Sequence, residues 1–166
     1  MKSKQKGNTF ERKIANKLSE RFASHLGIPN GFRRNPDSGS FFGGKNVARV
    51  ATHSSNHAAL SDIICPDDFN FLIECKHYKS APSFKALLKM SIEQWDQWIA
   101  QLEQNVKVVN KQPMLVIKYN NSDMFALVTS LPEGSEHSFK YKNYYVVLFD
   151  QILNLEDSFF FSQESA

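Results

Sequence analysis

The sequence predicts an α/β fold in which a central mixed β-sheet is flanked by helices. Two observations indicate it: helix-period and strand-period segments alternate along the chain, and two of the β-prone segments are close enough to form a hairpin. With 166 residues, 42% of them hydrophobic, the chain can bury one core. No internal repeat and no Gly/Ser or Pro linker divides it. We therefore expect one domain over residues 9–166, preceded by a flexible basic tail over residues 1–8.

The first expected element is a helix that runs from Asn8 or Thr9 to about Ser24. Either of the first two residues can cap a helix. Apolar side chains recur at helical spacing on one face, at Phe10, Ile14, Leu18 and Phe22. Glycine and proline within residues 27–31 end the helix. A short strand is expected at residues 32–34, before a loop rich in small polar residues.

The expected hairpin consists of residues 61–65 and 69–77. Both segments are β-prone, and the turn between them contains Pro66, Asp67 and Asp68. A long helix is then expected at residues 83–106. Further strands complete the sheet, at residues 113–119, 124–130 and 144–149.

The second strand of this hairpin carries charges where a buried strand would be apolar. If the turn centres between the two segments, Asp62 lies opposite Glu74, and Lys76 shares their face by the two-residue alternation of a strand. Asp67 lies in the turn, roughly 20 Å from Glu74, and cannot share the site. Two carboxylates and the backbone carbonyl of Cys75 suit a hard divalent cation, so we expect Mg²⁺, with Mn²⁺ as a substitute. Lys76 is then placed to hold a phosphate oxygen and the attacking water.

Several short motifs occur in a fixed order over roughly residues 6–78. They are Lys6-Gly7, Phe10-Glu11-Arg12, Gly31-Phe32-Arg33-Arg34, Ser38-Gly39-Ser40, Asp62 and Ile73-Glu74-Cys75-Lys76. In this order they resemble the PD-(D/E)xK nuclease superfamily, and within it the archaeal-type Holliday junction resolvases. The resemblance implies a restriction-endonuclease-like core and a Mg²⁺-dependent endonuclease that cuts four-way DNA junctions as a homodimer, in DNA recombination and repair. Ser61 departs from the pattern, since the superfamily usually has proline there.

The resemblance also implies a role for each matching residue. Asp62, Glu74 and the carbonyl of Cys75 would hold the metal, and Lys76 would assist the nucleophilic water. Glu11 would complete the acidic site, directly or through water. The DNA near the scissile phosphate would be contacted by Arg12, Ser38 and Ser40. Three further basic residues before the hairpin are expected to contact DNA, namely Arg33, Arg34 and Lys45.

Charge and cysteine content agree with a DNA-binding protein of the cytoplasm. The net charge of +3 and a pI near 8.8 permit a polyanionic partner. The sequence has two cysteines, no secretory leader and no apolar run of transmembrane length. Cys65 and Cys75 are out of register for a disulfide across the hairpin, so we expect two buried reduced thiols. No membrane partner is expected.

Less specific interpretations remain open. Glu74 and Lys76 would also fit a solvated sheet face, and the Arg33-Arg34 pair would fit an ordinary surface loop. A stripe at helical spacing fits either core or the surface of a homodimer, and it consists of Trp95, Trp98 and Leu102. At the level of function, the alternatives are a restriction-type or other structure-selective nuclease, and a noncatalytic DNA-binding protein on a nuclease fold.

Overall fold

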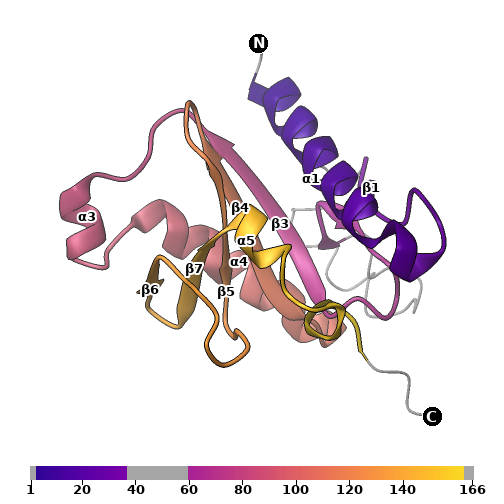
Figure 1. Cartoon of the computed structure of the whole chain (residues 1–166). Helices are drawn as coiled ribbons and strands as arrows, with labels where there is room; N and C mark the ends of the chain where they lie inside the picture. Colours follow the sequence, from indigo (N-terminus) through magenta and orange to yellow (C-terminus); the bar gives the residue numbers. More distant parts are fainter. Residues whose placement is uncertain (1–2, 37–59, 163–166) are drawn as a thin grey trace.

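The computed structural model describes residues 3–36 and 60–162, so Ser38, Ser40 and Lys45 lie outside the described residues. The elements follow one another along the chain from the N-terminal helix to a short C-terminal helix (Figure 1). They are α1 (Ser3–Leu26), β1 (Arg33–Arg34), β2 (Ile63–Ile64), β3 (Phe71–Tyr78), α3 (Phe84–Leu88), α4 (Glu93–Val109), β4 (Gln112–Tyr119), β5 (Met124–Val128), β6 (Phe139–Tyr141), β7 (Tyr144–Leu148), α5 (Phe149–Ile152) and α6 (Asp157–Phe160).

Five strands form the main sheet in the order β3-β4-β5-β7-β6. β3 and β4 run parallel and are connected through α4, whereas the other neighbours run antiparallel. The predicted α/β class with a mixed sheet is confirmed. β3 is an edge strand of this sheet, so one side of its backbone is available to groups from elsewhere in the chain.

Helices cover the two faces of β3 (Figure 1). On one face, α1 packs Phe10 and Ile14 into the same apolar cluster as Ile73 and Cys75. On the other face, α4 packs into a cluster that contains Leu72. Because side chains alternate along a strand, Glu74 and Lys76 leave β3 on the side of α4, as Leu72 does.

The tryptophan stripe on α4 belongs to the core. Trp95 and Trp98 are only 2% and 7% exposed. The indole Nε1 of Trp95 donates a hydrogen bond of 2.9 Å to the hydroxyl of Tyr119 on β4, and the ring of Trp98 lies 4.9 Å from the ring of Tyr78. Of the two interpretations of this stripe, core is therefore confirmed and a dimer surface is wrong, because these side chains pack inside the chain.

α1 begins earlier than the sequence predicts. The helix includes residues 3–8, which were expected to form a tail before a cap at Asn8 or Thr9. Lys4, Gln5 and Lys6 are strong helix formers, and the ammonium of Lys6 donates a hydrogen bond to the side chain of Asn120. Its C-terminal end agrees better with expectation, since Gly27 follows with a left-handed φ of 66°.

β2 pairs with β1, and the predicted hairpin between residues 61–65 and 69–77 is wrong as a strand pairing. Arg33 and Arg34 pair antiparallel with Ile64 and Ile63. The start of the expected second strand is bonded instead to the C-terminal end of the chain: Phe69 bridges to Phe161, and the amide of Asn70 donates to the carbonyl of Phe160 at 2.7 Å. Both partners are distant in sequence.

The long helix expected over residues 83–106 is divided into α3 and α4. Met90 adopts a left-handed φ of 49° between them. The amide of Ile92 donates to the hydroxyl of Tyr141 at 2.9 Å, so a side chain takes the place of a helical carbonyl. β6, α5 and α6 were not predicted, since each is too short to show a period. In the part of the chain that the structure describes, no helix is long and apolar enough to span a membrane.

Candidate active site

Glu74 is a buried carboxylate in the middle of β3. Its side chain is 3% exposed, and Oε1 lies 2.6 Å from the ammonium of Lys76. Oε2 is also buried, and within the described residues it has no hydrogen-bond partner. A carboxylate oxygen that is removed from water and left without a donor is costly. It is the kind of group that a bound cation would satisfy.

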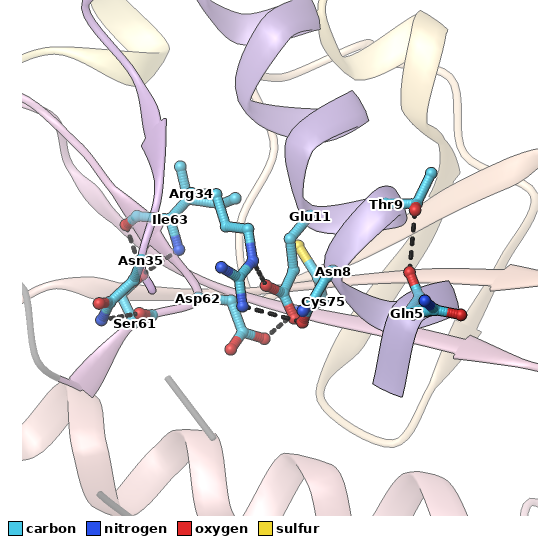
Figure 2. Close-up of polar contacts among 10 residues, drawn as sticks. All are labelled: Gln5, Asn8, Thr9, Glu11, Arg34, Asn35, Ser61, Asp62, Ile63 and Cys75. Carbon is cyan, nitrogen blue, oxygen red and sulfur yellow. Dashed lines mark hydrogen bonds and ion pairs between the residues drawn. The ribbon is translucent and has the colours of Figure 1, made fainter. Parts of the chain in front are cut away.

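Asp62 is held against the open edge of β3 (Figure 2). Its Oδ2 accepts a hydrogen bond of 2.7 Å from the amide of Cys75, and its own amide donates to the carbonyl of Ile73 at 3.1 Å. The expected proximity of Asp62 to residue 74 is therefore present, although the two segments form no ladder. In an extended strand the N–H and C=O of one residue point to the same side. The carbonyl of Cys75 therefore faces the edge where Asp62 lies.

Two polar residues that sequence reasoning did not assign to the site hold Asp62 in place. The hydroxyl of Ser61 lies 2.7 Å from the carbonyl of Ile63 and 2.9 Å from that of Ile73. The side-chain amide of Asn35 donates to the carbonyl of Ser61 at 2.8 Å, and its backbone amide donates to the carbonyl of Asp62 at 2.8 Å. Ser61 thus fixes the chain by hydrogen bonds at a position where a proline would restrict it through its ring.

Glu11 reaches the same region from α1, which covers the opposite face of β3. Its Oε2 lies 2.6 Å from Nε of Arg34, and Nη2 of Arg34 donates to the side chain of Asn8 at 2.8 Å (Figure 2). The two charged side chains are 11% and 16% exposed. Arg34 therefore forms an ion pair with Glu11, whereas the sequence predicts only that it contacts DNA.

The three carboxylates act on one another electrostatically. Burial and then the charge of Asp62 raise the pKa of Glu74 to about 7, against the opposing effect of Lys76. Burial and then Asp62 also raise the pKa of Glu11. Burial alone would lower the pKa of Lys76, but Glu74 and Asp62 raise it above its ordinary value. Lys76 is therefore a cation.

The donor set fits a cation that keeps part of its water shell. Within residues 3–36 and 60–162, no three His, Cys, Asp or Glu side chains are grouped so that they could hold a metal ion alone. Mg²⁺ needs only one or two carboxylates, with water and substrate phosphate completing its shell. Asp62, Glu74 with its unpartnered Oε2, and the carbonyl of Cys75 are oxygen donors of that kind. Glu11, paired with Arg34, is suited to contact through water.

The remaining predicted residues lie at different depths. Arg12 and Arg33 are exposed, on α1 and β1. Asp67 is exposed in the turn before β3, as expected for a residue outside the site. Both cysteines are free, and burial raises the pKa of each thiol. Cys75 is buried, as the sequence predicts, whereas Cys65 is only half-buried.

Comparison with known proteins places the chain in a family. The sequence matches the family described as "Phage putative PDDEXK endonuclease" over residues 2–158. Among solved structures, it is similar to Hjc of Archaeoglobus fulgidus, a Holliday junction resolvase, with 14% identity, 86% of each chain covered and a TM-score of 0.38. No curated protein matches at a significant level.

Proposed function

Because the chain belongs to the phage PDDEXK endonuclease family, we propose that it is a divalent-metal-dependent endonuclease that hydrolyses DNA phosphodiester bonds and prefers four-way junctions. The observation that carries the proposal is the edge of β3. There Asp62, Glu74 and Lys76 lie together, and a buried oxygen of Glu74 has no partner among the described residues.

Asp62, Glu74 and the carbonyl of Cys75 would hold the metal, Mg²⁺ or Mn²⁺. When bound there, the metal would polarise the scissile phosphate and acidify a water molecule. The amide of Cys75 holds one oxygen of Asp62 and so fixes the orientation of the carboxylate. Glu11, held by Arg34, would orient a water molecule from the side of α1.

Lys76 has two successive roles in this proposal. In the protein alone its ammonium neutralises Glu74 at 2.6 Å. During the reaction the same ammonium would donate hydrogen bonds to a phosphate oxygen and to the attacking water. In the protein alone, Glu74 and Asp62 raise the pKa of Lys76 against the opposing effect of burial, so its ammonium is a hydrogen-bond donor there.

DNA would approach along the basic residues near the site. Arg12 and Arg33 are exposed and can contact phosphates directly. We propose the same for Ser38, Ser40 and Lys45, whereas Arg34 would contribute mainly by orienting Glu11. Reduced thiols and a DNA substrate agree with activity in the cytoplasm, in DNA recombination or repair.

The preference for a junction rests on the ordered motifs of the sequence and on symmetry. A four-way junction presents two equivalent strands, and a two-fold homodimer can set one site on each. The expected products are symmetric cuts on opposing strands with ligatable 5′-phosphate ends.

The test compares an end-labelled four-way junction, a linear duplex of matching sequence and single strands, each with Mg²⁺, Ca²⁺ or EDTA. Light scattering gives the mass in the same buffer. We expect paired cleavage of the junction with Mg²⁺ or Mn²⁺, little with Ca²⁺, and a dimer. Equal cleavage of duplex and junction by a monomer would replace the resolvase with a restriction-type or other nuclease. If none of these substrates is cut although DNA is bound tightly, the chain is a noncatalytic DNA-binding protein.

A further inference from the structure

α3 is a short but well-formed helix that carries exposed apolar side chains. Ser83 caps it by accepting a hydrogen bond from the amide of Ala86 at 3.2 Å. At its end the amide of Lys89 donates to the carbonyl of Lys85, and that of Met90 to the carbonyl of Leu87. Figure 1 shows the helix projecting away from the sheet, on the connection from β3 to α4.

The outward face of α3 carries large apolar side chains that the fold does not bury. Ala86 and Leu87 pack against the α4-side core and attach the helix to it. Phe84 and Leu88 are 74% and 69% exposed, the highest values among the large apolar side chains of the described residues. Spaced four residues apart, they lie side by side on the helix. Because burying apolar surface stabilises a fold, two such side chains left in water contribute less to the free energy of folding than buried ones would.

Lysines flank this apolar pair. Lys85 and Lys89 have the same four-residue spacing, one position further along, and both are exposed. No acidic residue occurs within α3 or from Lys79 to Ile92. Met90, which is 41% exposed, continues the apolar surface. The result is a projection with an apolar tip and a cationic border.

We propose that α3 is a wedge that contacts DNA bases where they are unpaired or unstacked, with Phe84 and Leu88 against the base faces and Lys85 and Lys89 on the flanking phosphates. The occupant follows from the chemistry. Proteins insert Phe, Leu and Met between bases that are partly unstacked, and aromatic rings stack on bases of any sequence. The lysines disfavour a second copy of this surface, because they would repel their counterparts.

The choice of DNA as the ligand rests on the proposed nuclease function, and α3 is close enough along the chain to the proposed active site to contact the same DNA. Phe84 follows Lys76 by eight residues, so the Cα atoms are at most about 29 Å apart. One turn of B-DNA is about 34 Å long. A phosphodiester at Lys76 and an unstacked base at α3 can therefore belong to one DNA molecule, near its branch point.

The test measures DNA binding in EDTA, so that it does not depend on cleavage. The probes are a duplex with a short single-stranded gap carrying 2-aminopurine, and a fully paired duplex of equal length. We compare the wild type with Phe84→Ala/Leu88→Ala, and with Ile28→Ala/Val108→Ala, which removes exposed apolar side chains elsewhere. The four replaced side chains are all exposed, so both variants should fold.

We expect the α3 variant to bind the gapped DNA about 10-fold more weakly, to lose the change in 2-aminopurine fluorescence, and to bind the paired duplex as the wild type does. Lys85→Ala/Lys89→Ala should lower the salt dependence on both probes, by a slope of up to about two. Unchanged affinity for gapped DNA would overturn the wedge. So would a loss of dimer mass by light scattering with unchanged DNA binding, which would assign α3 to a contact between copies. If the wild type cuts DNA with Mg²⁺ in a parallel reaction, such a failure concerns the wedge alone.

Discussion

Metal binding should depend steeply on pH, because Glu74 must lose a proton before it can hold a cation. Burial, reinforced by the charge of Asp62, raises the pKa of Glu74 to about 7 from an ordinary value of 4.5. The carboxyl is then about one-tenth ionised at pH 6 and about nine-tenths ionised at pH 8. The proton therefore competes with the metal, and we expect apparent Mg²⁺ affinity to rise about 10-fold between these pH values.

The raised pKa of Glu74 also makes the stability of the metal-free protein depend on pH. A carboxyl whose folded pKa is raised favours folding most below its unfolded pKa, and that contribution is lost as pH rises through the folded pKa. From pH 4.5 to about 7 the loss amounts to about 3 kcal/mol. A bound cation would restore it, so Mg²⁺ should raise the melting temperature more at pH 8 than at pH 6.

The assay is thermal unfolding without DNA, at pH 6 and pH 8, over a Mg²⁺ titration. The wild type is compared with Glu74→Gln, which has no proton to lose, and with Asp67→Asn, which removes an exposed carboxylate outside the site. In Glu74→Gln the pH-dependent part of the Mg²⁺ effect should disappear, whereas Asp67→Asn should behave as the wild type. An Mg²⁺ effect of equal size at both pH values, or one retained in Glu74→Gln, would refute the reasoning.

Two further predictions concern neighbouring residues. Arg34→Ala should destabilise the fold by about 3 kcal/mol in a denaturant titration, because Glu11 would stay buried without its partner. Arg33→Ala should instead leave the stability unchanged and lower the salt dependence of DNA affinity by a slope of roughly one. Equal effects of the two changes would contradict the separate roles. Trp95→Ala should lower the free energy of unfolding by about 4 kcal/mol and leave the mass in light scattering unchanged. A shift from dimer to monomer would instead indicate that Trp95 lies at an interface between protomers.

The sequence predicted those parts of the fold that local patterns determine. The helix α1 and the strand β3 were placed correctly, because α1 has an apolar stripe at helical spacing and β3 begins with a continuous β-prone apolar run. The charges at Glu74 and Lys76 stood out for the same reason, since they interrupt that run. Asp62 was brought near residue 74 by the short turn between them, which limits how far apart the two segments can lie.

Long-range contacts could not be predicted. Nothing local shows that Arg33 and Arg34 would pair with residues 63–64, or that Phe161 would take the place beside Phe69. The ion pair of Arg34 with Glu11 joins residues 23 positions apart and depends on how α1 packs. The division between α3 and α4 depends on Tyr141 of a distant strand, whose hydroxyl accepts a hydrogen bond from the amide of Ile92.

The most direct measurement of the central claim is DNA cleavage by single-site variants of the β3 edge. With Mg²⁺ and a labelled four-way junction, Asp62→Asn, Glu74→Gln and Lys76→Ala should each abolish cleavage and keep most of the binding, since phosphate contacts elsewhere supply the affinity. Asp67→Asn, a carboxylate change outside the site, should cut at the wild-type rate. Cleavage by Glu74→Gln at the wild-type rate would contradict the account, because the buried carboxylate of β3 could then not be the metal ligand.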